Sequence, residues 1–346
     1  MSLPRRRPLA LALAPLLACT SPASDEGGDE LGDSSESASE SETGSETGET
    51  GETGETETDT GEPSPCDALV DGLNTGFDIE GTPRSFYLDL PAGVDEGGPW
   101  PVVFSWHGLG DSASNFHGLF AGEVDNPDMP FILVTPEDTD FLLSVPLIGT
   151  VPFDWDTFAV PAGGAGNLEV ALFDTVLACV DERWGVDAEH VHSVGFSLGG
   201  ITSDMLATVR GEQLGSVATW SGGYWNNPDN VGLSLNSVVD WPALAVANPY
   251  AQLLVHGGPS DELPIVENVY TMSFYEFALS DHDFLLAAGH PVVMCAHTQG
   301  HAAPASISAS TVIRFFADHP LGVGVSPWIA NPPASGVDGC QFDLSP

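Results

Sequence analysis

The segment from Val191 to Ile201, VHSVGFSLGGI, constrains the fold more than any other part of this sequence. A short apolar run leads into Gly195-Phe196-Ser197-Leu198-Gly199, and residues 201–209 have the composition of a helix. This pattern predicts a strand, a sharp turn with Ser197 at its apex, and a helix. Two glycines are expected here because a Cβ atom at either position would collide with the neighbouring strand or helix. Such a turn holds a serine hydroxyl out of the sheet, where a base can reach it.

Residues 1–19 have the pattern of a targeting segment. Three arginines at positions 5–7 precede an apolar run, residues 9–17, that is too short to span a bilayer. The run ends at Leu16-Leu17-Ala18-Cys19, which resembles a bacterial lipobox, in which the cysteine becomes the lipidated first residue. We therefore expect lipidation at Cys19 and an extracytoplasmic protein anchored to a bacterial membrane, at the outer membrane or cell surface. The alternative is an ordinary secretory signal, which would release the protein.

Residues 20–65 are expected to form a disordered linker. They consist almost entirely of Ser, Glu, Thr, Gly and Asp and include a degenerate Glu-Thr-Gly repeat that begins at Glu46. Such a segment cannot bury enough apolar area to offset its chain entropy. The other apolar runs lie in residues 66–346, which we expect to form one catalytic domain.

The charge of the chain excludes several partners. The formal net charge is −43, there is no lysine, and the basic residues after the signal are four arginines and the histidines. Phosphate binding needs clustered cations, so we expect no nucleic-acid partner and no contact with a membrane beyond the N-terminal lipid. We expect a monomer.

If Cys19 is lipidated, four cysteines remain for an oxidising compartment: Cys66, Cys179, Cys295 and Cys340. Three pairings are possible, and we favour Cys66 with Cys340 and Cys179 with Cys295. No pair has C-x-x-C spacing, so a zinc site on thiolates is not expected. We expect no metal and no cofactor.

Apolar runs that alternate with helical patterns predict an α/β domain, a mostly parallel sheet with helices on both faces. The expected strands are 85–90 (antiparallel), 101–106, 131–135, the run before Ser197, 216–221, 252–255 and 291–295. One expected helix begins at Asp111 or Ser112 and ends at Ala121. The other expected helices span 167–184, the segment after Ser197, 264–279 and 306–317. We expect residues 141–160 and 222–239 to form loops at the site.

Polar groups follow four of these strands. Ser197 follows one strand, Asp261 follows strand 252–255, His301 follows strand 291–295, and His107 follows strand 101–106. Because the carboxyl ends of parallel strands meet at one edge of a sheet, these groups are expected to converge. The chain order Ser, acid, His is that of the α/β-hydrolases. We predict Ser197 as nucleophile, His301 as base and Asp261 as the acid that orients the base.

An oxyanion hole is expected beside Ser197. The N–H of Leu198 and one N–H from the Gly108-Leu109 turn would hold the negative oxygen. His107 is expected to shape this turn rather than to act as a base.

Other residues could take some of these roles. Glu262 or Asp240 could replace Asp261, and His297 lies close to His301 in the sequence. We expect Asp154 and Asp156 to be solvated loop residues. Four large aromatic residues could line a pocket or lie in the core: Trp106, Trp155, Tyr224 and Trp225.

Several motifs together resemble a known family. The segments from Arg84 to Gly93, Pro101 to Gly110 and Val186 to Gly200, with Gly300-His301-x-x-Pro304, are similar to the polyhydroxybutyrate depolymerase-like and feruloyl esterase group of secreted α/β-hydrolases. The resemblance covers roughly residues 84–317 and implies the same three catalytic residues. Two features depart from the family: the turn before Asp261 is one residue longer, and Ala302-Ala303 follows His301 where the family has Thr-Trp.

The sequence therefore predicts an extracytoplasmic serine carboxylic-ester hydrolase that acts on a small or polymer-linked ester. The acyl group stays open between a hydroxycinnamate, a short polyester and an acetyl group on a sugar. The alternative is an inactive binding protein on the same scaffold.

Overall fold

The computed structural model describes residues 64–145, 149–230, 239–244, 249–266 and 270–342. The predicted signal segment, Cys19, nearly all of the predicted linker and most of the expected loop after residue 230 lie outside these residues. Within the described part of the chain, no helix is long and apolar enough to cross a membrane.

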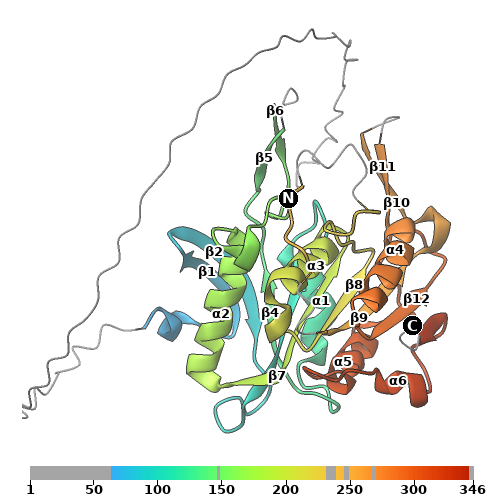
Figure 1. The fold of residues 1–346 in the computed structure, drawn as a ribbon. Coiled ribbons are helices and arrows are strands. Elements are labelled where there is room, and N and C mark those ends of the chain that lie inside the picture. The colour runs from blue at the N-terminus through green and yellow to red at the C-terminus, as the bar shows by residue number, and fades with distance from the viewer. Residues whose placement is uncertain (1–63, 146–148, 231–238, 245–248, 267–269, 343–346) are drawn as a thin grey trace, which may run out of the picture. The chain divides into compact units, whose positions relative to one another are not determined.

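A large mixed sheet forms the centre of the described domain (Figure 1). Among the described residues it has nine strands in the order β1-β2-β4-β3-β7-β8-β9-β12-β13. Neighbours from β4 to β12 run parallel, and β1, β2 and β13 pair antiparallel at the two edges. The strands are β1 Gly72–Ile79, β2 Thr82–Asp89, β3 Trp100–Trp106, β4 Ile132–Pro136, β7 Val186–Phe196, β8 Ser216–Trp220, β9 Ala251–His256, β12 Val292–Ala296 and β13 Cys340–Phe342. Two antiparallel hairpins stand apart from it in the described chain, β5 Leu142–Val145 with β6 Gly149–Pro152 and β10 Glu262–Val266 with β11 Tyr270–Ser273.

Helices cover both faces of the sheet, as the sequence pattern predicts. The α-helices are α1 Ala113–Phe120, α2 Leu168–Trp184, α3 Leu198–Arg210, α4 Phe274–Ala287, α5 Ala309–Asp318 and α6 Pro327–Ala330. Helices α2, α3 and α4 pack into one apolar core, and α1, α5 and α6 pack into the other. The inner strands supply both cores because successive side chains point to opposite faces. Val102 and Phe104 of β3 lie in the first core, and Val103 lies in the second.

The order of the strands determines where a site can form. From β3 the chain moves to β4 on one side, and it then returns to β7 on the other side of β3. The loops that follow β3 and β7 therefore leave in opposite directions and open a crevice at the carboxyl edge. Ser197 follows β7 directly, so it lies at this point.

Local signals explain where three helices begin. Asn167 accepts hydrogen bonds from the N–H groups of Glu169 and Val170 at the start of α2. Ser112 caps α1, which settles the choice between Asp111 and Ser112. Ser273 caps α4 through the N–H of Glu276. The predicted helix over 264–279 is therefore wrong in its first half, where β10 and β11 form a hairpin instead.

The predicted disulfide pairing is also wrong. The structure joins Cys66 to Cys179 and Cys295 to Cys340. The short 3₁₀ turn Pro65–Ala68 lies against α2, where the Arg183 guanidinium donates to the carbonyl oxygen of Cys66 at 3.0 Å. Cys340 lies directly opposite Cys295 in the antiparallel ladder of β12 and β13. Two disulfides in a chain of this kind indicate an oxidising, extracytoplasmic compartment.

Candidate active site

A strained turn joins β7 to α3 at Ser197. Its backbone has φ 56° and ψ −120°, a conformation that residues other than glycine rarely adopt. The turn needs glycine on both sides, as predicted from the sequence. A Cβ atom on Gly195 would overlap the carbonyl group of Gly199, and one on Gly199 would overlap the carbonyl oxygen of Trp106 in β3. Ser197 is thereby held at the carboxyl edge of the sheet.

A chain of hydrogen bonds links Ser197, His301 and Asp261. The Oγ atom of Ser197 lies 2.9 Å from Nε2 of His301, and Nδ1 of His301 lies 2.8 Å from Oδ1 of Asp261. Asp261 is fully buried, whereas the His301 side chain is 17 % exposed. The three residues come from loops that follow β7, β9 and β12, so the convergence expected for a parallel sheet is present.

Two aromatic rings hold the imidazole of His301. The ring of Phe274 stacks on it at 4.6 Å between centroids, and the ring of Phe196 lies 4.9 Å away. Phe196 is the last residue of β7, and Phe274 is the first residue of α4. The orientation of the His301 ring therefore depends on β7, which precedes Ser197, and on α4, which begins at Phe274.

The alternative acids and base lie elsewhere. His297 accepts the N–H of Gln299 at its Nδ1 atom, and burial lowers its pKa. Glu262 is exposed at the start of β10, and Asp240 is exposed in a bridge to Ala159. Within the described chain, neither acid is hydrogen-bonded to His301, and His297 is not hydrogen-bonded to Ser197.

The Gly108-Leu109 turn lies beside Ser197. An added Cβ atom on Gly108 would lie 3.4 Å from Cβ of Ser197, so the two segments are in close contact. In the described part of the structure, the N–H groups of Leu198 and Leu109 have no hydrogen-bond partner. Both groups are available to a negative oxygen at this place.

Asp154 and Trp155 hold this turn from outside. Oδ2 of Asp154 accepts the N–H of Gly110 at 2.5 Å, and Nε1 of Trp155 donates to the carbonyl oxygen of His107 at 2.9 Å. Burial raises the pKa of the Asp154 carboxyl, and burial with the neighbouring charge of Glu169 raises that of Asp156 to about 6. The two aspartates do lie in a loop, as interpreted from the sequence, but both are only partly exposed, and Asp154 is hydrogen-bonded to the protein. Asp154 and Trp155 support the turn beside Ser197, whereas the main chain of Asp156 contacts Asn167 and Glu169 at the start of α2.

An apolar pocket with a volume of about 40 Å³ opens at Ser197. Its lining consists of apolar side chains apart from Ser197: Leu109, Phe153, Phe158, Leu198, Ile201, Trp225, Leu263, Met272 and Phe274. Of the four aromatic residues considered in the sequence, Trp225 lines this pocket. Trp106, Trp155 and Tyr224 are fully buried in the core.

Two buried acids hold the loop that carries Trp225. Asp204 of α3 accepts the N–H of Gly223, and Asp281 of α4 accepts the N–H of Tyr224. Burial raises the pKa of Asp204 well above its usual value and raises that of Asp281 to about 7. The loop that carries Trp225 is therefore held in place by buried side chains of α3 and α4.

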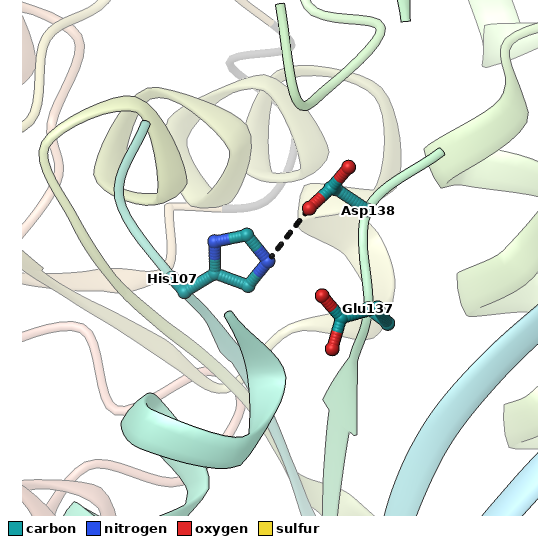
Figure 2. Close-up of side chains that lie close together, drawn as sticks. All are labelled: His107, Glu137 and Asp138. Carbon is teal, nitrogen blue, oxygen red and sulfur yellow. Dashed lines mark ion pairs between the residues drawn. The ribbon is translucent and has the colours of Figure 1, made fainter. Parts of the chain in front are cut away.

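A second polar cluster lies behind the Gly108-Leu109 turn. His107, Glu137 and Asp138 bring ligand atoms to within 4.8 Å of one another (Figure 2). Burial raises the pKa of the Glu137 carboxyl, and the nearby charge of His107 opposes this shift. An imidazole nitrogen with two carboxylates is a donor set that can hold a divalent cation.

Sequence reasoning missed several residues around the site: Ser221, Phe274, Asp154 and the buried pair Asp204 and Asp281. Ser221 could have been found, because it directly follows strand β8 at the same sheet edge. The others contact the site through packing between distant segments and carry no local signal.

Known proteins resemble this chain in part of its sequence and in its fold. No protein-family model matches the sequence. The chain is 30% identical over 156 residues to Feruloyl esterase D of Neurospora crassa, a match that covers 44% of this chain and 50% of that protein. The chain thus spans about half the length of the curated relative it matches.

Solved structures share the fold. Native pOPH matches with a TM-score of 0.62 at 17% identity, over 80% of this chain and 95% of that one. A CE1 ferulic acid esterase from Anaeromyces mucronatus, solved with ferulic acid, matches with a TM-score of 0.50 at 17% identity, over 72% and 90% of the two chains. These matches confirm the predicted α/β-hydrolase fold, and the sequence match confirms the resemblance to the feruloyl esterase group.

Proposed function

We propose that this protein is an extracytoplasmic serine esterase in which Ser197 is the nucleophile, His301 the base and Asp261 the orienting acid. The observation that carries the proposal is the unbroken chain of hydrogen bonds from Ser197 through His301 to Asp261. The similarity to a feruloyl esterase and the two disulfides support the activity and the compartment.

The directions of the hydrogen bonds define the roles. An ionised carboxylate accepts only, so Nδ1 of His301 donates to Asp261 and Nε2 is left with a lone pair. That lone pair can take the proton of Ser197 as its oxygen attacks the carbonyl carbon of an ester. His301 then returns the proton to the leaving alcohol, and water releases the acyl group by the same steps in reverse order.

The N–H groups of Leu198 and Leu109 complete the mechanism. Both are free to donate to the oxygen that becomes negative when Ser197 attacks. Loss of one such donor costs about 3 kcal/mol of transition-state stabilisation in serine hydrolases. The contacts of Asp154 and Trp155 keep this turn in place before the substrate arrives.

The pocket favours a short apolar acyl group. Among the described residues its lining offers no charged side chain, and its volume of about 40 Å³ has room for a few heavy atoms. An acetyl or butyryl group meets both conditions. Of the acyl groups considered from the sequence, the short ones are therefore preferred.

A fluorophosphonate probe tests the nucleophile. We expect the probe to label the wild-type protein at Ser197, and we expect Ser197→Ala to abolish both labelling and hydrolysis of p-nitrophenyl acetate. Ser310→Ala, which removes an exposed serine, is the matched control and should behave as wild type. A folded wild-type protein that neither reacts with the probe nor hydrolyses p-nitrophenyl esters would favour the inactive binding protein instead.

A substrate series tests the acyl group. The ratio kcat/KM should be higher for p-nitrophenyl acetate and butyrate than for p-nitrophenyl octanoate and methyl ferulate. A preference for methyl ferulate would contradict the short acyl group but would leave the serine mechanism intact.

A further inference from the structure

His107 carries a ring nitrogen that the serine mechanism does not use. Its Nδ1 atom lies 3.0 Å from the carbonyl oxygen of Gly108, which can only accept, so Nδ1 carries a hydrogen. In the neutral ring, Nε2 then has a lone pair. The His107 side chain is fully buried, and Nε2 has no hydrogen-bond partner among the described residues.

Two carboxylates face this nitrogen (Figure 2). Nε2 of His107 lies 3.6 Å from Oδ2 of Asp138, which is beyond hydrogen-bond distance, and Glu137 completes the cluster within 4.8 Å. A lone pair and two carboxylates that converge in this way repel one another unless positive charge lies between them. This repulsion is relieved either by a proton on Nε2 or by a cation bound between the three groups.

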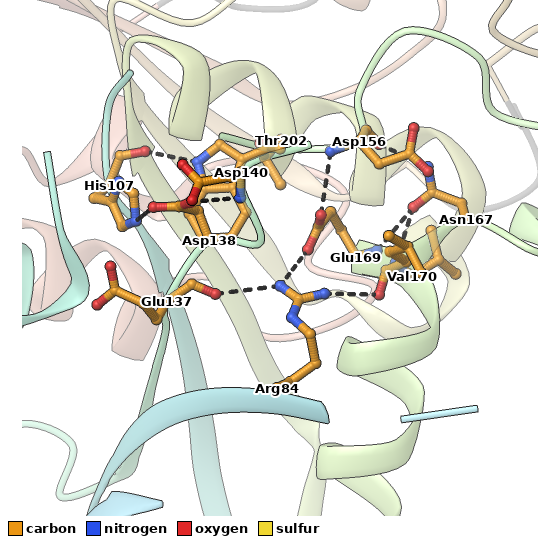
Figure 3. A network of polar contacts seen from close by, with 12 residues as sticks. Arg84, His107, Glu137, Asp138, Asp140, Asp156, Asn167, Glu169, Val170 and Thr202 are labelled. Carbon is orange, nitrogen blue, oxygen red and sulfur yellow. Dashed lines mark hydrogen bonds and ion pairs between the residues drawn. The ribbon is translucent and has the colours of Figure 1, made fainter. Parts of the chain in front are cut away.

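The arginines do not supply this charge. Arg84 approaches Glu137 only through the main-chain oxygen, at 3.3 Å, and its guanidinium pairs with the buried carboxylate of Glu169 at 2.8 Å (Figure 3). Elsewhere in the described chain, Arg210 pairs with Asp174, Arg314 pairs with Asp318, and Arg183 donates to the carbonyl oxygens of Cys66 and Leu69. The sequence has no lysine.

We propose that His107, Glu137 and Asp138 bind a divalent cation of the zinc or manganese type. An imidazole nitrogen with carboxylate oxygens is a donor set that these ions accept. Two ligands at ~2.1 Å from an ion in tetrahedral geometry lie ~3.4 Å apart, close to the separation of Nε2 and Oδ2. The cation would supply positive charge at the cluster, as a proton on Nε2 would in its absence.

The cation would act on the oxyanion turn. His107 directly precedes Gly108-Leu109, and Glu137 accepts the N–H of Ala113 at the start of α1, at 3.2 Å. An ion bound by both residues ties the two ends of the segment 107–113 to β4. The bound cation then positions the N–H of Leu109. This consequence rests on the proposed esterase function, whereas the binding of the cation itself does not depend on that function.

Metal binding by the full-length protein tests the proposal directly. After treatment with EDTA and its removal, titration calorimetry with ZnCl₂ and with MnCl₂ should show one ion bound per chain for at least one of the two metals. Asp138→Asn and Glu137→Gln should each weaken this binding by at least about tenfold. Asp89→Asn is the matched control, because Asp89 pairs with His117 at 2.8 Å in a separate contact, and it should bind as wild type.

Two results would overturn the site. If wild-type protein binds neither metal, the cluster of His107, Glu137 and Asp138 is not a site for these cations. If all variants bind equally, the ion sits at other histidines. Circular dichroism of each variant confirms that it is folded. The titration of the wild-type protein alone shows whether either metal binds, so this result does not depend on the folding of a variant.

The effect on the oxyanion turn has its own readout. Removal of the metal should lower kcat for p-nitrophenyl acetate by up to about 100-fold, with KM little changed, and the bound metal should restore it. Unchanged kcat in protein proven metal-free would contradict the positioning role. If the protein has no esterase activity, the titration still decides whether the metal site exists.

Discussion

Ser221 donates its hydroxyl hydrogen to Oδ2 of Asp261 at 2.9 Å, and the N–H of Gly257 donates to the same oxygen at 2.8 Å. The other oxygen of Asp261 faces His301. Ser221 lies at φ 55°, and its own N–H is bonded to the carbonyl oxygen of Val255. The Asp261 carboxylate, proposed to orient the base, is therefore held by the ends of two neighbouring strands, β8 and β9.

Ser221→Ala should lower kcat while KM stays nearly the same. A hydrogen bond to a charged group contributes about 1.5 kcal/mol or more, which corresponds to roughly a tenfold loss in rate. We expect the substitution to change kcat rather than KM because Ser221 contacts Asp261 and is not among the described residues that line the pocket. Steady-state kinetics with p-nitrophenyl acetate measures both constants. A variant with wild-type kcat would show that Gly257 alone holds the acid.

His301→Ala should lower kcat by a factor on the order of 10⁴ or more, as expected when a triad loses its base. His297→Ala is the matched control, because His297 lies four residues earlier and, in the described chain, its side chain accepts the N–H of Gln299 rather than contacting Ser197. It should reduce kcat far less. A larger loss from His297→Ala would transfer the role of base to that residue.

The buried carboxyl of Asp281 should make stability depend on pH. Its folded-state pKa of about 7 lies above the value of about 4 for an unfolded chain, so the folded protein binds the proton more tightly. The contribution of Asp281 to stability is therefore fully present below pH ~4 and is lost as pH rises through ~7. Within this window the loss approaches about 1.4 kcal/mol per pH unit.

Asp281→Asn provides the test of this dependence. Urea unfolding of wild type and variant at several pH values gives the difference in unfolding free energy. The unfolding free energy of the variant should increase relative to that of the wild type as pH rises from 4 to 7. A difference that stays constant over this range would mean that Asp281 titrates as an ordinary carboxyl in the folded protein.

Cys19→Ser should release the protein from membranes into the soluble fraction. The prediction rests on the lipobox-like sequence Leu16-Leu17-Ala18-Cys19. Fractionation of expressing cells, followed by detection of the protein in each fraction, measures the distribution. Identical partition of the variant and the wild type would indicate that the segment is not a lipoprotein signal.

Much of the candidate site could be predicted because its signals are local. The glycines around Ser197 reflect a turn whose geometry depends on adjacent residues, and the structure shows the overlaps that a Cβ atom would cause. Asp261 and His301 each follow an apolar strand, and parallel strands bring their carboxyl ends to one edge whatever the detailed packing. The predicted strands and the caps of α1 and α2 are likewise properties of short segments.

Tertiary structure decided what depends on contacts between distant segments. The disulfide partners follow from which elements pack together: Cys66 lies against α2, and Cys340 lies opposite Cys295 in a ladder. Spacing along the chain contains no information about either contact. The hairpin of β10 and β11 replaced part of a predicted helix because Ser273, rather than an earlier residue, caps α4.

The residues that support the site could not be predicted for the same reason, since they contact it through tertiary packing. Ser197 stands in a recognisable pattern, but Phe274 stacks on His301 and Asp154 bonds to Gly110 only because loops from different strands meet above the sheet. The sequence by itself indicated the central strands of the sheet, most of the helices between them and the turn that presents the serine. The three-dimensional packing determined the orientation of the base, the shape of the pocket and the meeting of His107 with Glu137 and Asp138, since each arises from side chains brought together through space.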